Sequence, residues 1–184
     1  MGKGVGDIYI QASCRILLTK TYSIQDCTEY DTLTSDKNKH TFKTGSGSLT
    51  YSSNGLNVAG NTNTDSYTQN SVVLPSEYTL EVDIDFVQSS GWTSAIVCED
   101  MFIAKNGNQG LQFIKISANQ IVDSYATSDV TGALKLERTG TQFKVYWKST
   151  LVKTITDISS TNAYGFMTYN NRQATFKNLK IKPL

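Results

Sequence analysis

The chain has 184 residues, of which 39% are hydrophobic and 18% are charged, and its formal net charge is +1. This length suits one domain with a short appendage, and a near-neutral chain without a dense basic patch is not expected to bind nucleic acid. Two Pro and thirteen Gly exclude a collagen-like or disordered composition.

Residues 1–7 carry neither the apolar core of a signal peptide nor a myristoylation signal. Apolar runs such as residues 16–18 are far too short to cross a bilayer. We therefore expect synthesis in a cytoplasm without membrane insertion. Action outside a cell would require release by lysis or as part of a particle.

The three cysteines are Cys14, Cys27 and Cys98. An odd count without a signal peptide argues against a disulfide framework, although Cys14 and Cys27 can face each other on a hairpin. Cys98 follows an apolar run and is expected to be a small buried residue. Since zinc needs four close ligands and His40 is the one histidine in a polar stretch, we expect no zinc site.

The chain divides into three parts by composition. In residues 1–30, positions 8–13 alternate apolar and polar side chains, and we expect an N-terminal β arm that docks on the rest of the chain or on a neighbouring subunit. Residues 31–48 are polar and rich in glycine, and we assign them to a linker or first loop. Residues 49–184 carry short strands about every ten residues, as in a β-sandwich.

Two segments give the strongest strand signals. Residues 49–52 and 56–59 flank Asn54-Gly55, the dipeptide most typical of a hairpin. Residues 78–86 alternate apolar and polar side chains, which no amphipathic helix does. We count about twelve strands and no helix. Since each strand has one apolar face, two sheets packed face to face would bury these faces between them.

Several segments resemble the concanavalin A-like lectin/glucanase superfamily. Residues 134–146 match the pattern L-x-L-x-R-x-G-x-x-F-x-V-Y of its laminin G-like members, and Leu151-Val152 follows as in that family. Residues 74–84 and 174–181 fit a further strand and the last strand. The resemblance implies an all-β, two-sheet antiparallel jelly roll that binds a glycan or a protein. With its β arm, the chain also resembles structural proteins of tailed bacteriophages.

The acidic row Glu81, Asp83 and Asp85 resembles the catalytic strand of the superfamily's glucanases. The chain departs from that pattern because Asp85 or Phe86 replaces the second glutamate, and a retaining pair needs carboxyls about 5–5.5 Å apart. We interpret Glu81, Asp83 and Asp85 as a solvent-facing acidic row on an otherwise apolar strand. Binding of Ca²⁺ by clustered carboxylates is the second interpretation, and catalysis is the third.

Aromatic side chains out of phase with the core are the better functional signal. Tyr146 and Tyr169 are out of phase with their apolar neighbours, and Trp92 is expected in a loop. Aromatic faces stack on sugars while amides and cations bind the hydroxyl groups. The candidate ligand-binding residues are therefore Tyr146, Tyr169, Asn170, Asn171, Arg172, Trp92 and Lys144.

These observations favour a non-enzymatic binding or adhesion module of a virus particle that recognises host-surface carbohydrate. The N-terminal arm is expected to contact other virion proteins. Its unpaired β edge favours a homo-oligomer or a multi-copy assembly. A purely structural virion protein without a glycan ligand is the alternative. A glycan hydrolase is a further alternative. We expect no cofactor, apart from the Ca²⁺ considered above.

Overall fold

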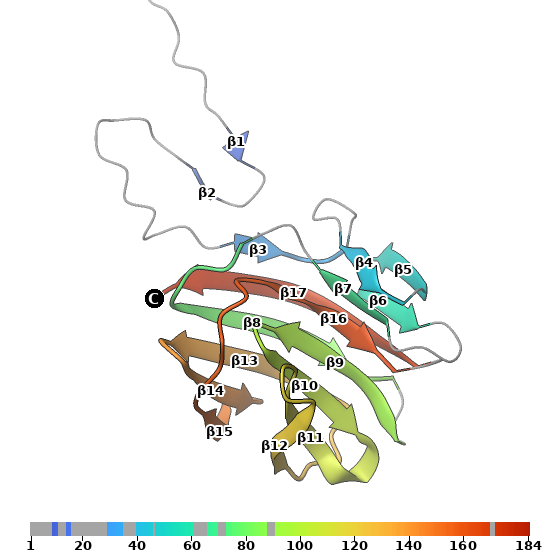
Figure 1. Ribbon diagram of the computed structural model, residues 1–184. Coiled ribbons are helices and arrows are strands. Elements are labelled where there is room, and N and C mark those ends of the chain that lie inside the picture. Colours follow the sequence, from blue (N-terminus) through green and yellow to red (C-terminus); the bar gives the residue numbers. More distant parts are fainter. Residues whose placement is uncertain are drawn as a thin grey trace, which may run out of the picture.

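The computed structural model describes residues 9–10, 14–15, 29–34, 40–45, 47–60, 66–69, 73–87, 91–169 and 172–184. Within these ranges the chain is almost entirely β-structure, with one short 3₁₀ turn at Gly107–Gln109. Two antiparallel sheets pack face to face, as Figure 1 shows. The all-β, two-sheet sandwich expected from the sequence is confirmed.

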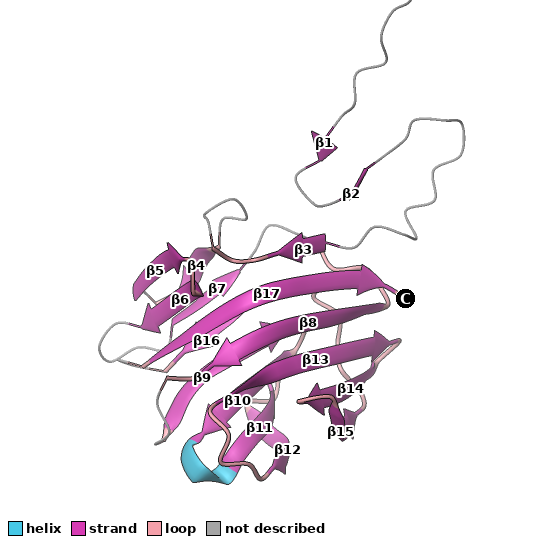
Figure 2. Ribbon diagram, turned by 180° about the vertical axis from the view of Figure 1, so that it is seen from behind, coloured by secondary structure: helices cyan, strands magenta, loops and turns pink. Residues whose placement is uncertain are grey.

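The first sheet, which we call the β8 sheet, contains β3 (Glu29–Asp31), β5 (Gly47–Ser52), β6 (Gly55–Gly60), β8 (Tyr78–Asp85), β13 (Thr131–Thr139), β14 (Gln142–Trp147), β15 (Thr150–Ile155) and β17 (Gln173–Pro183). Its order is β15-β14-β13-β8-β17-β6-β5, and β3 pairs with β17 beyond the end of β6. Figure 2 shows the long strands β17, β8 and β13 running side by side.

The second sheet, which we call the β9 sheet, contains β4 (Thr41–Thr44), β7 (Ser66–Gln69), β9 (Trp92–Cys98), β10 (Met101–Asn106), β11 (Gly110–Lys115), β12 (Gln120–Tyr125) and β16 (Tyr164–Thr168). Its order is β12-β11-β10-β9-β16-β7-β4. Connected strands therefore alternate between the two sheets at several points, as expected for a jelly roll.

The core lies between the sheets and follows directly from the period-two pattern. Along β8 the side chains of Tyr78, Leu80, Val82 and Ile84 are at most 3% exposed, while the residues between them are half-buried or exposed. The side chains that the β9 sheet contributes to this core include Ile96, Ile103, Phe113 and Phe166. Burying one such side chain contributes about 1.5–3 kcal/mol, which fixes the register of each strand.

The hairpin predicted at Asn54-Gly55 is confirmed, and both it and the β13–β14 hairpin have a defined register. In β5–β6, Ser52 pairs with Gly55, so the loop residues are Ser53 and Asn54 rather than Asn54 and Gly55. Gly55 opens β6 with a φ of 112° and lies against the Phe176 carbonyl, where a Cβ would clash. In β13–β14, the pairing runs from Leu134 with Trp147 to Thr139 with Gln142.

A buried ion pair joins the two sheets at one end of the sandwich. Arg138 Nη1, on β13, lies 2.5 Å from Glu99 Oε1, just beyond β9, and the two side chains are 6% and 0% exposed. The backbone N–H groups of Thr161 and Asn162 donate to Glu99 Oε2 at 2.6 and 2.7 Å. The Tyr78 hydroxyl donates to Glu99 Oε1 at 3.3 Å. A buried carboxylate is tolerated only with such partners.

The edge strands of the two sheets, β15 and β12, are bridged along one side. Lys153 Nζ of β15 lies 3.0 Å from Asp123 Oδ1 of β12. Beside it, Lys115 Nζ donates to the Asp157 backbone oxygen at 2.9 Å. Charged side chains on edge strands disfavour pairing with another chain.

Some local expectations need correction. Thr41–Thr44 forms β4 inside the range assigned to a linker, because Phe42 packs against the core. His40 lies in a loop as expected, but it is buried, at 5% exposed, and lies 4.8 Å from the Phe166 ring centroid. Trp92, also expected in a loop, begins β9.

The arm and the cysteines are described only in part. Tyr9–Ile10 (β1) and Cys14–Arg15 (β2) form a two-stranded antiparallel pair, and the division at residues 30 and 48 otherwise stays a prediction. Cys27 lies outside the described residues, so the proposed pairing with Cys14 is untested. Cys98 is a free, buried thiol, as expected. None of the described helices is long and apolar enough to span a membrane.

Candidate functional site

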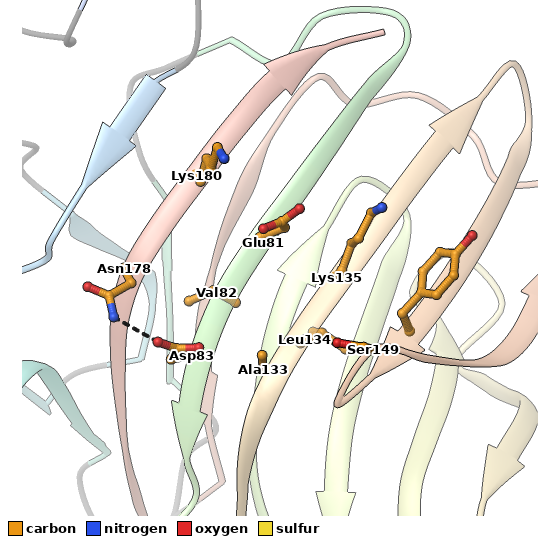
Figure 3. A pocket seen from close by; sticks show the side chains of 10 residues that line it. Glu81, Val82, Asp83, Ala133, Leu134, Lys135, Ser149, Asn178 and Lys180 are labelled. Atoms are coloured by element: carbon orange, nitrogen blue, oxygen red, sulfur yellow. Dashed lines mark hydrogen bonds between the residues drawn. The ribbon is translucent and has the colours of Figure 1, made fainter.

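A groove runs over the outer face of the β8 sheet. Its larger cavity, of about 600 Å³, is lined by residues from β8, β13, β14 and β17 and by the turn after β14: Glu81, Val82, Asp83, Ala133, Leu134, Lys135, Tyr146, Ser149, Asn178 and Lys180. Figure 3 shows these strands side by side, with their polar side chains pointing into the same space. The polar positions of the alternating pattern therefore line a groove.

Strand register places opposite charges in one row across the groove. Glu81 on β8 pairs with Lys135 of β13 on one side and with Lys180 of β17 on the other. Figure 3 shows Lys180, Glu81 and Lys135 in this order across the three strands. Among the described residues, Glu81 makes no ion pair within 4.0 Å, and it lines the groove.

The next row is shaped by a small residue and a bulge. Asp83 pairs with Ala133 of β13, whose methyl group leaves the groove open on that side. On β17, the register shifts between Lys177 and Lys180, and Asn178 takes a φ of 55°. This bulge lets Asn178 Nδ2 donate to Asp83 Oδ2 at 2.7 Å, the dashed bond in Figure 3. Asn tolerates this left-handed conformation better than most residues.

A second cavity of about 490 Å³ continues the groove along β8 and β13. It shares Asp83 and Ala133 with the first cavity and is lined beyond them by Asn54, Ile84, Asp85, Thr131, Gly132, Thr175 and Lys177. Asp85 Oδ1 accepts from the Val87 backbone N–H at 2.9 Å. The two cavities together form one elongated site with Asp83 at its middle.

Tyr146 forms the aromatic end of the groove, and its side chain is half-buried. Its hydroxyl donates to Glu137 Oε2 at 3.3 Å, and Lys135 Nζ lies 4.9 Å from the ring centroid. Lys144, the next residue on this face, contacts Glu137 Oε1 at 3.3 Å. These contacts hold the Tyr146 ring in place, while Lys144 lies beyond the groove lining.

The remaining predicted site residues do not join Tyr146. Trp92 and Tyr169 lie together on the outer face of the β9 sheet, with ring centroids 5.3 Å apart. Arg172 lies three residues after Tyr169 in the chain. Asn170 and Asn171 lie outside the described residues. The described candidate residues are thus divided between the two outward faces of the sandwich.

The sequence prediction missed most of the groove. Lys135, Asn178 and Lys180 were not candidates, and Glu81 and Asp83 were considered only for catalysis or Ca²⁺. Period-two alternation in residues 134–147 and 177–182 indicated which side chains share a face, but the strand neighbours depend on long-range pairing. The β-bulge at Asn178 carries no signal that a single sequence reveals.

Within the described residues, no group of three or more His, Cys, Asp or Glu is placed to hold a metal ion. The carboxylates of Glu81, Asp83 and Asp85 stand along one strand, where residues two apart are separated by about 6.5–7 Å at the backbone. Ca²⁺ takes six to eight oxygen ligands at 2.3–2.6 Å. The acidic row therefore does not form a Ca²⁺ cage by itself.

Neither family models nor curated proteins match the chain. Among solved structures, it is similar to the carbohydrate-binding module CBM66 from Bacillus subtilis, with 23% identity and a TM-score of 0.61 over 76% of this chain and 94% of that one. A protein of unknown function with a galectin-like fold, also from Bacillus subtilis, matches with 10% identity and a TM-score of 0.64 over 84% and 94% of the two chains. A β-glucanase from Bacillus licheniformis matches with 11% identity and a TM-score of 0.62 over 85% and 98%.

These likenesses confirm the fold that the sequence resemblance implied. The chain is a jelly roll of the concanavalin A-like and galectin-like kind. At this level of identity the comparison establishes the architecture, and the chemistry of the site must come from the chain's own residues.

Proposed function

We propose that this chain is a non-catalytic carbohydrate-binding module whose ligand lies in the groove of the β8 sheet. The observation that carries the proposal is the row Lys180–Glu81–Lys135 ending at the Tyr146 ring. Sugars offer hydroxyl groups to carboxylates and ammonium groups, and C–H faces to an aromatic ring. The similarity to a carbohydrate-binding module supports the same function.

The groove's length and charge define the ligand further. The first cavity carries Glu81 and Asp83 with Lys135 and Lys180, so its formal charges cancel. This balance favours a neutral glycan, whose hydroxyl groups both donate and accept. Two cavities joined at Asp83 suit several linked sugar units rather than one monosaccharide.

The geometry of β8 favours binding over hydrolysis. Its pairing with β13 is regular from Thr131 to Arg138, so Glu81 and Asp85 stand about 13 Å apart at the backbone. Asp83, between them, is held towards β17 by Asn178. A retaining pair needs carboxyls about 5–5.5 Å apart, and an inverting pair flanks the sugar from opposite faces. Asp85, or Phe86, stands where the glucanase strand has its second glutamate, and the shorter Asp85 side chain reaches less far across this separation.

Binding to a broad glycan array tests the function. Tyr146→Ala is expected to weaken retention about tenfold or more, the effect of losing an anchoring aromatic side chain. Tyr146→Phe keeps the ring and is expected to retain most of the affinity. Leu151→Ala is the matched control, because Leu151 pairs with Tyr146 at the edge of the sheet but does not line the groove.

The array also tests the two alternatives. Binding that survives a metal chelator agrees with a site built from protein groups alone. Hydrolysis of a bound glycan, abolished by Glu81→Gln, would replace the binding module with a hydrolase. A blank array with folded protein would contradict glycan binding and favour a structural role.

The location in a virion stays a proposal that rests on the sequence, as does assembly through the N-terminal arm. The self-paired strands β1 and β2 support an arm with its own β-structure. Removing residues 1–28 is expected to abolish incorporation into particles while leaving glycan binding intact. Unchanged incorporation would exclude the arm as the attachment segment. Analytical ultracentrifugation of the full chain and of the chain without residues 1–28 would measure the oligomeric state of each.

A further inference from the structure

The outer face of the β9 sheet differs chemically from the groove. The described side chains that β9, β10, β11 and β16 turn outward are uncharged: Trp92, Val97, Phe102, Ala104, Asn106, Gln112, Ile114 and Met167. The outer face of the β8 sheet, in contrast, carries rows of carboxylates and lysines. The two faces are therefore built for different contacts.

The accessible part of this face is small and aromatic. Its aliphatic members Val97, Ala104, Ile114 and Met167 are already buried, with at most 8% exposed. Trp92 and Tyr169 are half-buried and pack over this cluster. Their ring centroids lie 5.3 Å apart at an angle of 44°, so the two rings form an open wedge whose underside is fixed by the cluster. Because the aliphatic part is covered, this is not a broad apolar interface.

Amide side chains border the aromatic pair. Asn106 is the register partner of Trp92. Its Nδ2 donates to Gln109 Oε1 at 2.9 Å and to Gln112 Oε1 at 3.3 Å, and Gln112 Nε2 donates to Gln109 Oε1 at 3.1 Å. These bonds fix the three amides in a cluster. In the described bonds, Asn106 Oδ1 accepts nothing and Gln109 Nε2 donates nothing, so the cluster keeps acceptor and donor capacity for a ligand.

A cation lies close to the backbone just before Trp92. The Arg172 guanidinium lies 3.8 Å from the position that a Cβ of Gly91 would occupy, next to Trp92 in the chain. Gly91 has a φ of 66° and no side chain, so it leaves this approach open. The guanidinium adds hydrogen-bond donors beside the rings.

We propose that Trp92, Tyr169, the Asn106–Gln109–Gln112 amide cluster and Arg172 form a second, independent binding site for a neutral sugar. Flat rings flanked by uncharged amides suit the alternating C–H faces and hydroxyl groups of a sugar. A lipid would need the broad apolar area that is covered here. The second site does not rest on the function of the groove.

Two sites on opposite faces make the chain bivalent. A polysaccharide chain held at the groove and another at the Trp92 site would be cross-linked by one protein molecule. Among flexible polysaccharide chains that reach both faces, engagement of both sites raises the apparent affinity without any new contact. Weak affinity at each site is therefore compatible with firm attachment.

Tryptophan fluorescence isolates the second site. The chain has two tryptophans, of which Trp147 is buried at 2% exposure and Trp92 is half-buried on the surface. Maltohexaose, laminarihexaose and chitohexaose would each be titrated to millimolar concentration while emission and iodide quenching are recorded. At least one is expected to shift the emission and protect Trp92 from iodide. Trp92→Phe should remove this change, and Tyr146→Ala should leave it in place.

A second variant separates binding from folding. Gln109 is exposed and belongs only to the amide cluster, so Gln109→Ala should fold normally and weaken the fluorescence-detected binding about fivefold, the effect of about one hydrogen bond. No response to any of the three sugars would overturn the proposal. A response lost in Tyr146→Ala but kept in Gln109→Ala would also overturn it, because the sugar would then act through the groove.

Discussion

The buried ion pair between Glu99 and Arg138 gives the sharpest stability prediction. Glu99→Gln keeps the shape of the side chain and removes its charge. One oxygen faces Arg138 and the other accepts from the N–H groups of Thr161 and Asn162. Whichever way the new amide turns, its NH₂ group faces a donor, and Arg138 loses its charged partner.

Breaking a buried pair in this way costs about 3–5 kcal/mol. For a chain of this length, 1 kcal/mol corresponds to about 2–4 °C in Tm, so Glu99→Gln should lower Tm by roughly 6–20 °C. The matched control is Glu137→Gln, whose partner Lys144 is 41% exposed and whose loss should cost at most about 1 kcal/mol. Differential scanning calorimetry measures both. Equal decreases in Tm for the two variants would refute the claim that burial makes the Glu99–Arg138 pair more important for stability than the exposed pair.

Three further predictions concern the fold around the groove. Gly132→Ala places a Cβ 2.6 Å from the Trp147 ring and should lower the free energy of unfolding by about 1–3 kcal/mol; chemical denaturation checks this. Asn178→Ala should cost about 1 kcal/mol more than Asn178→Gly in the same assay, because alanine tolerates a φ of 55° poorly; equal losses would exclude backbone strain. Burial raises the pKa of Cys98 to about 12, so its thiol stays protonated in the folded chain while the unfolded thiol ionises near pH 8.5. Its contribution to stability should therefore be complete below about pH 8.5 and fall by up to about 1.4 kcal/mol per pH unit above it, and Cys98→Ala should flatten this slope in denaturation series from pH 8 to 11.

The sequence predicted the fold where alternation was strict. Residues 78–86 carry an uninterrupted period-two pattern, residues 134–138 and 143–147 carry it on either side of a turn, and burial of one face leaves a single register. Tyr146 was placed correctly away from the core for the same reason. Trp92 was misplaced, and the burial of His40 was missed, because a polar or glycine-bearing surrounding was given more weight than tertiary packing, which here buries His40 against Phe166.

The site was predictable only as a list of side-chain types. Alternation indicates that Glu81, Lys135, Tyr146 and Lys180 each face outward, but strands distant in sequence must pair before these residues share one groove. The same limit explains why Tyr146 and Trp92 were grouped together, although they belong to opposite faces. The Asn178 bulge depends on an irregular register that local pattern does not encode.

Blocking the groove at Ala133 tests the central claim most directly. Ala133 is exposed and lines both cavities beside Asp83, so Ala133→Trp fills the groove without removing a polar contact, and Ala133→Ser is the matched control. Calorimetric titration with the best-retained neutral glycan of the array, on variants of unchanged Tm, should show binding lost in Ala133→Trp and kept in Ala133→Ser. Affinity equal to that of the unmodified chain in Ala133→Trp would contradict the assignment of the groove as the glycan site.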